Sequence, residues 1–261
     1  MFLQILKYYS QQALAYPSET FFVIIRKAIG LFFRGTFWVF LVKDQNMFMS
    51  IYLPYLLISS GLSDLFAIPG RTSYSVGKVV RKSIKSGEFS NYILLPTNLL
   101  VYLYGKSTGQ NIVLIIVAII QLGVGFILIP HIEVTTLGLF VLFAIIAFIL
   151  AIAFNLLEAS LAFFFTEAKG IKNAIRHIYS VFSGELIPLN LLPANWQFLL
   201  LFSPFSFMNY WPVAIITNIK IQPPVNLLNT LITGMLWTLI ISLSVIFLWK
   251  KGIKEYEAIG L

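Results

Sequence analysis

The sequence predicts an all-α polytopic membrane protein, whose chain crosses the bilayer several times. Of its 261 residues, 59% are hydrophobic and 11% are charged, whereas a soluble domain carries about 25% charged residues. Long apolar runs recur along the whole length, and the two-residue alternation of a membrane β-barrel is absent. The chain has no cysteine, which excludes disulfides and thiolate metal sites. We therefore expect one transmembrane domain over residues 1–261.

The first segment, residues 1–20, predicts a helix that lies on the membrane before the first span. Apolar side chains fall on one face at helical spacing and polar side chains on the other, as in interfacial helices. The chain is expected to turn into the membrane near Pro17. Such a helix either anchors the first span or has a mechanical role, and both readings stay open. The apolar face comprises Phe2, Ile5, Leu6, Tyr9 and Ala13, and the polar face Gln4, Lys7, Gln11 and Gln12.

Six segments are apolar enough to span a hydrocarbon core about 30 Å thick, which needs roughly 20 helical residues. They cover residues 21–41, 48–68, 108–129, 134–154 (extending towards 165), 175–192 and 227–249. Between the last two, residues 193–217 are apolar but are interrupted by Pro204 and Pro212. Because proline breaks helices, this segment predicts short re-entrant helices on the outer face, shielded from lipid by protein. Trp196, Tyr210 and Trp211 suit the boundary between membrane and water.

The basic residues indicate the orientation of the spans. With six spans both termini share a side, and that side would carry thirteen lysines and arginines, against Lys43 and Lys220 on the other. Cytoplasmic loops are enriched in Lys and Arg, so both termini are expected in the cytoplasm. The net charge of +8 is spread over short loops and does not indicate nucleic-acid binding. The thirteen are Lys7, Arg71, Lys78, Arg81, Lys82, Lys85, Lys106, Lys169, Lys172, Arg176, Lys250, Lys251 and Lys254.

A second amphipathic helix is predicted in the cytoplasmic loop 70–96, at SVGKVVRKSIKSGE (residues 75–88). At 100° per residue its branched apolar side chains cluster opposite its basic ones. The helix either adheres to anionic lipid, with about 1 kcal/mol from each basic residue, or docks on a cytoplasmic partner. The apolar side comprises Val76, Val79, Val80 and Ile84, and the basic side Lys78, Arg81, Lys82 and Lys85.

Residues 105–108, Gly-Lys-Ser-Thr, match the end of a phosphate-binding P-loop. The complete motif needs another glycine five residues before the second one, where this chain has Leu100. The loop that would surround the phosphates is therefore missing, and a nucleotide site in this chain is not expected.

Four of the charged residues within or near the predicted spans are candidates for a polar site, because a charge inside a span costs about 2.5–3.5 kcal/mol by insertion measurements. They are Arg26 and Arg34 in the first span, Asp64 in the second and Glu158 at the lower end of the fourth. If these spans adjoin, Arg26 is expected to pair with Asp64, and Arg34 with Glu158. Such pairs either set helix register or belong to a polar path or gate for a substrate.

Three motifs resemble, in order, those of the ABC-2 type permeases, the membrane subunits of bacterial ATP-driven exporters. They are KSIKSGEFSNYILLPTN after the second span, FSGELIPLNLLPANW after the fifth, and LWKKGIKEYEAIG at the end. Relatives carry G-E-x-x-x-x-L-L-x-P, F-S-G-x-x-x-P-L-x-x-x-P and W-x-x-G-x-K-x-Y-E-x-x-G at these places. The likeness covers essentially the whole chain. Leu95 departs from it, because many relatives have a basic residue before the proline.

The resemblance implies a transport subunit of the bacterial plasma membrane that is not itself an enzyme. A separate cytoplasmic ABC ATPase would bind ATP and Mg²⁺, and this chain would hold no cofactor or metal. Two permease chains, identical or related, would form the pathway, surrounded by membrane lipids. The loop 70–96 would carry the helix that couples to the ATPase, with Arg81, Lys82, Lys85 and Glu88 in contact. The predicted coupling site comprises Val76, Lys78, Val80, Arg81, Lys82, Ile84, Lys85, Gly87 and Glu88.

The resemblance also implies an outer gate at Gly184, Glu185, Pro188 and Pro193. From the residues alone, Gly184 can end a helix with a positive φ, and the two prolines prevent one regular helix from continuing. A rigid cap is the alternative to a gate.

Two other function classes, a secondary transporter and a lipid-modifying enzyme, are the alternatives to a permease. A stand-alone secondary transporter would show two similar halves or helices broken near mid-membrane, and no internal repeat is evident. An intramembrane lipid-modifying enzyme would need clustered His, Asp or Glu near one interface, yet His131 and His177 are assigned to opposite faces.

Overall fold

The structure, a computed structural model, describes residues 1–66, 75–95, 98–165, 177–219 and 225–260. Within these ranges the regular elements are helices, which confirms the predicted class, and no strand occurs among them. The named helices are α1 (Phe2–Leu14), α2 (Pro17–Val42), α3 (Gln45–Met47), the π-helical turn η1 (Phe48–Tyr52), α4 (Leu53–Leu65), α5 (Val76–Ser86), α6 (Phe89–Ile93), α7 (Leu99–Gln110), α8 (Ile112–Ile127), α9 (Val134–Phe164), the 3₁₀ turn η2 (Leu189–Leu191), α11 (Ala194–Leu201), α12 (Pro204–Met208), α13 (Tyr210–Ile216) and α14 (Leu227–Gly260).

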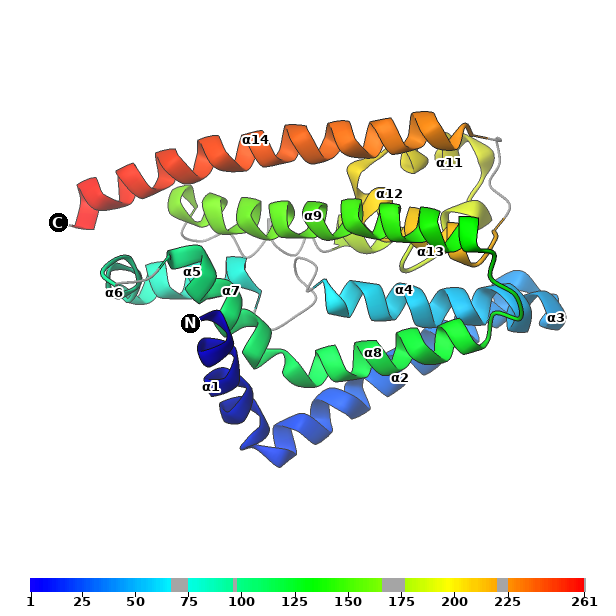
Figure 1. Cartoon of the computed structure of the whole chain (residues 1–261), viewed down its shortest axis with the longest axis horizontal. Coiled ribbons are helices and arrows are strands. Elements are labelled where there is room, and N and C mark those ends of the chain that lie inside the picture. The colour runs from blue at the N-terminus through cyan, green and yellow to red at the C-terminus, as the bar shows by residue number, and fades with distance from the viewer. Residues whose placement is uncertain (67–74, 96–97, 166–176, 220–224, 261) are drawn as a thin grey trace.

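Five helices, α2, α4, α8, α9 and α14, run along the long axis of the molecule (Figure 1). The two ends of the chain lie at the same end of this bundle, together with α5 and α6, while α3 lies at the opposite end (Figure 1). We call the end with the termini and α5 the near end, and the end with α3 the far end. The arrangement agrees with the expectation that both termini share a side.

Two described helices, α9 and α14, are each long and apolar enough to cross a membrane. The pair α7 and α8, which is bent by 68° at Asn111, adds a third if it is counted as one span. The predicted count of six is thus not confirmed by length and composition. The first predicted span, α2, carries Arg26, Lys27 and Arg34, and the second is divided between η1 and the 13-residue helix α4.

The predicted fifth span, residues 175–192, does not form one helix. In its described part the helix covers residues 177–182 and gives way to turns and η2; residues 175 and 176 lie outside the described ranges. Gly184 has φ of +74°, as expected for a residue that ends a helix. A Cβ at this position would lie 2.9 Å from Tyr210, so the approach of that ring also requires glycine.

The predicted re-entrant segment folds into α11, α12 and α13, and Pro204 begins α12. Of the three aromatic residues expected at the membrane boundary, Tyr210 and Trp211 are completely buried within the chain, whereas Trp196 is 58% exposed. Trp211 Nε1 donates to the carbonyl of Leu201 at 2.8 Å. A buried indole needs such a partner, and the surrounding protein supplies it in place of interfacial water.

Residues 2–14 form α1, the helix that the N-terminal pattern predicted, and it packs across α7. Close approach depends on Gly109 of α7, where a Cβ would lie 2.7 Å from Tyr9 and 2.8 Å from the carbonyl oxygen of Leu6. Gly105, from the Gly-Lys-Ser-Thr motif, faces Ile5 in the same way. The motif is therefore part of a helix, and its glycine serves helix packing rather than a phosphate loop.

Gly109→Ala is expected to destabilise the protein by about 1–3 kcal/mol, because the added methyl group overpacks the contact between α1 and α7. The free energy of unfolding in mixed micelles with SDS measures the change. Gly123→Ala in α8 is the matched control, since nothing lies within 4 Å of its Cβ position. Equal stability of the two variants would contradict this account of the packing.

Candidate functional site

The stretch at residues 75–88, predicted to hold the coupling helix, contains α5, which covers Val76–Ser86. The Ser75 side chain accepts a hydrogen bond from the Lys78 backbone N–H, as an N-cap residue does. Gly87 follows the helix with φ of +75°, the left-handed conformation that glycine adopts without a Cβ penalty. Local sequence therefore determines where this helix begins and ends.

The apolar side of α5 packs against its own chain. Val76 and Val80 are buried with Phe89, Leu103 and Ala159 in a cluster that joins α5 to α6, α7 and α9. Burial of aliphatic side chains of this size stabilises by about 1.5–3 kcal/mol each. These valines, included in the predicted coupling site, consequently position the helix and are not available for lipid or a partner.

Arg81 holds α5 to α9 through an ion pair with Glu158, in which the guanidinium nitrogen lies 2.8 Å from the carboxylate oxygen. Gly77 lies directly against the Glu158 side chain, because a Cβ there would be 2.8 Å from three of its carbon atoms. The prediction that Arg34 pairs with Glu158 is wrong. Arg34 lies about 12 Å from the far end of α2, and Glu158 about 9 Å from the near end of α9, so their depths differ.

The remaining predicted coupling residues divide by exposure. Lys82, Lys85, Gly87 and Glu88 are exposed, whereas Lys78 and Ile84 are partly buried. Arg81, expected to contact a partner, instead has its charge directed at Glu158 with 19% of the side chain exposed. The exposed charged residues on α5 and just after its end are thus Lys82, Lys85 and Glu88.

The C-terminal motif converges on the same place, which spacing along the chain did not reveal. Gly252 lies against Phe163 of α9, where a Cβ would be 2.5 Å from the ring. The Trp249 ring lies 5.5 Å from that of Phe163, and Tyr256 lies 5.1 Å from Phe89 of α6. Phe89, from the motif that follows α5, and Trp249 and Tyr256, from the motif at the chain end, therefore belong to one cluster. This cluster packs α5 against α9 and α14.

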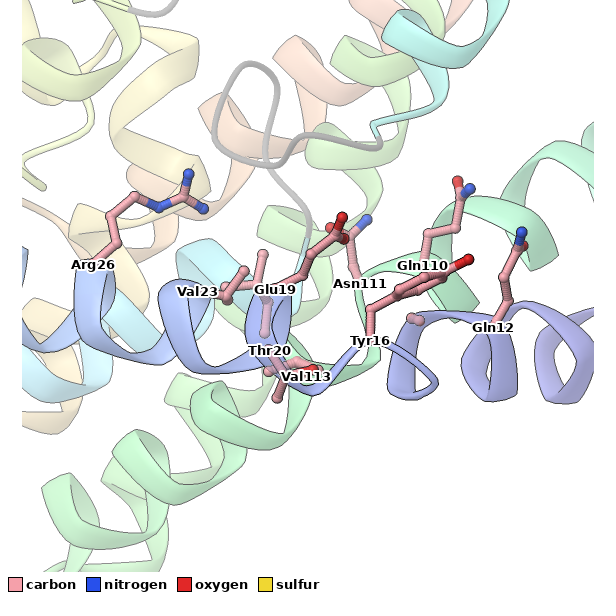
Figure 2. A pocket seen from close by; sticks show the side chains of 11 residues that line it. Gln12, Tyr16, Glu19, Thr20, Val23, Arg26, Gln110, Asn111 and Val113 are labelled. Atoms are coloured by element: carbon pink, nitrogen blue, oxygen red, sulfur yellow. The ribbon is translucent and has the colours of Figure 1, made fainter.

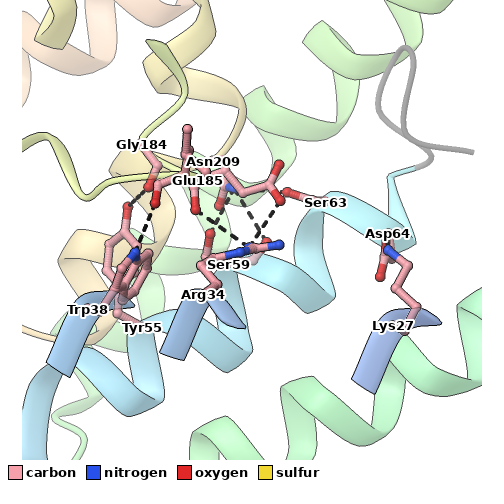
Figure 3. A network of polar contacts seen from close by, with 11 residues as sticks. Lys27, Arg34, Trp38, Tyr55, Ser59, Ser63, Asp64, Gly184, Glu185 and Asn209 are labelled. Atoms are coloured by element: carbon pink, nitrogen blue, oxygen red, sulfur yellow. Dashed lines mark hydrogen bonds and ion pairs between the residues drawn. The ribbon is translucent and has the colours of Figure 1, made fainter. Parts of the chain in front are cut away.

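A second group of polar contacts lies inside the bundle, between α2, α4 and residues 184–186 (Figure 3). Lys27 pairs with Asp64, and Arg34 pairs with Glu185 at 3.1 Å. The prediction that Arg26 pairs with Asp64 is wrong by one residue. Successive residues on a helix point about 100° apart, so only Lys27 faces α4, and Arg26 is exposed.

The predicted outer-gate residues form part of this buried network. Tyr55 donates to the carbonyl of Gly184 at 2.9 Å, and Trp38 Nε1 donates to the carbonyl of Leu186 at 2.8 Å. Glu185 is 2% exposed, so it lies within the bundle and not on an open outer loop. Pro188 is buried and Pro193 is exposed. A role for these residues as a gate stays a prediction.

Sequence reasoning missed Lys27 and a third polar contact beside it. Asn209, between α12 and α13, donates to the hydroxyl groups of Ser59 and Ser63 of α4, each at 2.9 Å (Figure 3). The available signal was the run of small and polar residues at 59–64 within an apolar segment. Small residues allow close approach in membranes, and hydroxyl groups hydrogen-bond across helices.

The matching motifs and this arrangement of α5 on the bundle agree with a comparison of the sequence with protein families. Residues 46–260 match the family described as ABC-2 family transporter protein. The chain belongs to this family. It is therefore a membrane protein and an ABC-2 type permease, a family that implies association with an ABC ATPase. A search among curated proteins found no match to the chain.

Arg34→Met in this ABC-2 permease is expected to lower the free energy of unfolding by up to about 3–5 kcal/mol, because it leaves the buried Glu185 carboxylate without its cation. Arg26→Met on the same helix is the matched control, since that side chain is exposed. Unfolding in SDS micelles measures both variants. A loss as large for Arg26→Met would show that charge on α2, and not pairing, is what matters.

Arg81→Gln and Glu158→Gln are expected to be non-additive, with a coupling energy of about 0.5–3 kcal/mol in a double-mutant cycle. The reason is that each single variant leaves the other charge buried without its partner. The same cycle on Lys251 and Glu255, an exposed pair at 3.8 Å, should give at most about 0.5 kcal/mol. Additive effects at Arg81 and Glu158 would mean that the ion pair does not hold α5 to α9.

Proposed function

We propose that this chain is the permease subunit of an ATP-driven ABC-2 exporter, which works with a separate cytoplasmic ATPase and a second permease chain. Family membership supports the transport role. The coupling role is supported by the way α5 is attached to the bundle. One side of α5 is buried against α9, and the other side exposes charged residues. A helix attached in this way has a surface for a partner and a rigid connection to the bundle.

The docking surface in this proposal consists of Lys82, Lys85 and Glu88 on the exposed side of α5 and at its end. The basic majority of this surface favours an acidic face on the ATPase, because complementary charge steers association and sets register. Arg81 acts through Glu158 and positions the helix. The near end, which holds α5 and both termini, is accordingly assigned to the cytoplasm, in agreement with its basic residues.

Motion at α5 would pass to two long helices. α9 has 31 residues and α14 has 34, so they measure about 46 Å and 51 Å. Both contribute to the cluster beneath α5 through Phe163, Trp249 and Tyr256. Since packed interiors are nearly incompressible, displacement of α5 would move these helices as bodies. The second chain, identical or related, would supply the other wall of the pathway.

ATP enters this proposal as a ligand of the partner. Gly105 and Lys106 lie within α7, and the glycine contacts Ile5 of α1. A P-loop needs free backbone N–H groups around the phosphates, and the N–H groups inside a helix are used by the helix. The energy source is accordingly placed in the separate ATPase.

Gly184 and Glu185 are proposed to control access from the far side. Their segment connects α2 and α4 through Tyr55, Trp38 and Arg34. A change in the angle between α2 and α4 would have to break or move these contacts. Buried charge pairs favour discrete arrangements over gradual ones, because an unpaired intermediate is costly.

Lys85→Glu is expected to reduce permease-stimulated ATP hydrolysis at least about tenfold, since like charges opposed across an interface cost several kcal/mol. The measurement uses the permease co-expressed with its ABC ATPase and reconstituted in lipid vesicles. Lys43→Glu is the matched charge reversal at the far end of α2, and it should leave stimulation unchanged. Transport by the permease alone, without any ATPase, would overturn the proposal.

A further inference from the structure

Lys106 is a partly buried cation whose nearest described contacts are aromatic rings and a phenol hydroxyl. Its Nζ donates to the Tyr92 hydroxyl at 2.9 Å and lies 5.3 Å and 5.2 Å from the ring centres of Tyr9 and Tyr92. Among the described residues, none of the ion pairs includes it. Aromatic faces stabilise an ammonium group, but they do not neutralise it. The site is therefore electrostatically suited to an anion.

Tyr9, whose ring lies beside Lys106, does not supply that anion. Burial raises the pKa of the Tyr9 hydroxyl above its ordinary value, and the hydrogen bond with Tyr102 at 2.7 Å raises this pKa further. Tyr9 is consequently a neutral phenol at physiological pH. Its position is determined by α1, which lies close to α7 at Gly109.

Lys106 lines a pocket of about 380 Å³ formed by α5, α6 and α7. Lys78, Lys82 and Lys106 line it, and among the described lining residues Glu88 is the single acidic one. The space is several times the roughly 30 Å³ share of a water molecule. Lysine is a common ligand for phosphate, because its ammonium group acts as a point charge with three donors.

Gln110, one turn after Lys106, is a second polar residue of the pocket, and its side-chain oxygen lacks a hydrogen-bond donor within the described part of the chain. Its side chain lines this pocket and also a neighbouring one of about 350 Å³ beside the turn between α1 and α2 (Figure 2). Gln110 Oε1 is buried and accepts no hydrogen bond from the described residues. Because an unsatisfied buried acceptor is costly, a rotation of this amide that brings its oxygen to a ligand hydroxyl group in the pocket would be favourable.

We propose that the pocket binds a phosphoglycerol group, whose phosphate contacts Lys78, Lys82 and Lys106 and whose hydroxyl donates to Gln110. Two sources carry this chemistry: the headgroup of an anionic phospholipid, and soluble glycerol phosphate. The structure favours the lipid, because α1 beside the pocket exposes Leu3 (74%) and Tyr8 (63%). An amphipathic helix with such residues lies at the level of lipid headgroups. Lys82 and Glu88 belong both to this pocket and to the docking surface proposed on α5, whereas Lys106 and Gln110 belong to the pocket and not to that surface.

Native mass spectrometry of the detergent-solubilised full chain, titrated with phosphatidylglycerol, tests the proposal. Phosphatidylglycerol should bind more tightly than phosphatidylcholine, and Lys106→Gln should weaken its binding at least about tenfold, because one charge-assisted contact is lost. Lys106→Arg should retain most of the affinity, since it keeps the charge. Lys7→Gln, an exposed lysine of α1, removes the same charge outside the pocket and should have no effect. If Lys106→Gln does not fold, Lys78→Gln takes its place.

Three results would overturn the proposal. One is the absence of a preference for phosphatidylglycerol, and another is an equal loss for Lys106→Gln and Lys7→Gln, which means unspecific attraction. The third is loss of ATPase capture by Lys106→Gln with unchanged lipid binding, which assigns the pocket to the partner protein. Competition by glycerol 3-phosphate at equal concentration would support the site with a soluble ligand. Lys85 does not line the pocket, so failure of the coupling test and failure of this one are distinguishable.

Discussion

Charge buried among apolar helices is the constraint on which this structure depends. The carboxylates of Asp64, Glu158 and Glu185 are at most 6% exposed, and an unpaired charge at such depth costs several kcal/mol. Each of them meets a cation from another element, and each pair therefore specifies which elements adjoin and at what depth. The pairs are Lys27–Asp64, Arg34–Glu185 and Arg81–Glu158.

The pairs divide the molecule into two functional regions. At the near end, Arg81 and Gly77 attach α5 to α9 beside aromatic residues from α6, α9 and α14, so α5 moves only with those helices. Within the bundle, Arg34 and its neighbours attach α2 and α4 to residues 184–186. The proposed coupling uses both properties, because movement imposed at the near end would have to alter contacts deeper in the bundle. The motifs shared with the family lie in these two regions.

Sequence reasoning located the elements of the candidate site better than it located their contacts. The limits of α5 were predictable, because Ser75 and Gly87 act through hydrogen bonds and φ angles within a few residues. The turn at Gly184 was predictable for the same reason. The partner of Asp64 was not, since choosing between Arg26 and Lys27 needs the rotation of α2 about its axis, which depends on every helix packed against it.

The predicted fifth span shows a different limit of sequence reasoning. Apolar composition at residues 175–192 and 193–217 indicates removal from water, but protein interior and lipid satisfy that requirement equally. Tyr210 and Trp211 suited a membrane boundary by their chemistry, and they are buried because protein carbonyl groups and rings surround them instead. The roles of Gly105 and Lys106 were not predictable either, because both residues contact α1, which is far away in the sequence.

By itself, the sequence determined that this is a helical membrane protein of the ABC-2 family, where its amphipathic helices lie, and that Gly184 ends a helix. These properties depend on composition and on interactions within one or two helical turns. Only the tertiary structure decided which charges pair, which face of α5 is exposed, and that Lys106 lines a pocket with Lys78 and Lys82. Those properties depend on the relative rotation and depth of helices far apart in the chain, and such geometry results from the packing of the whole bundle.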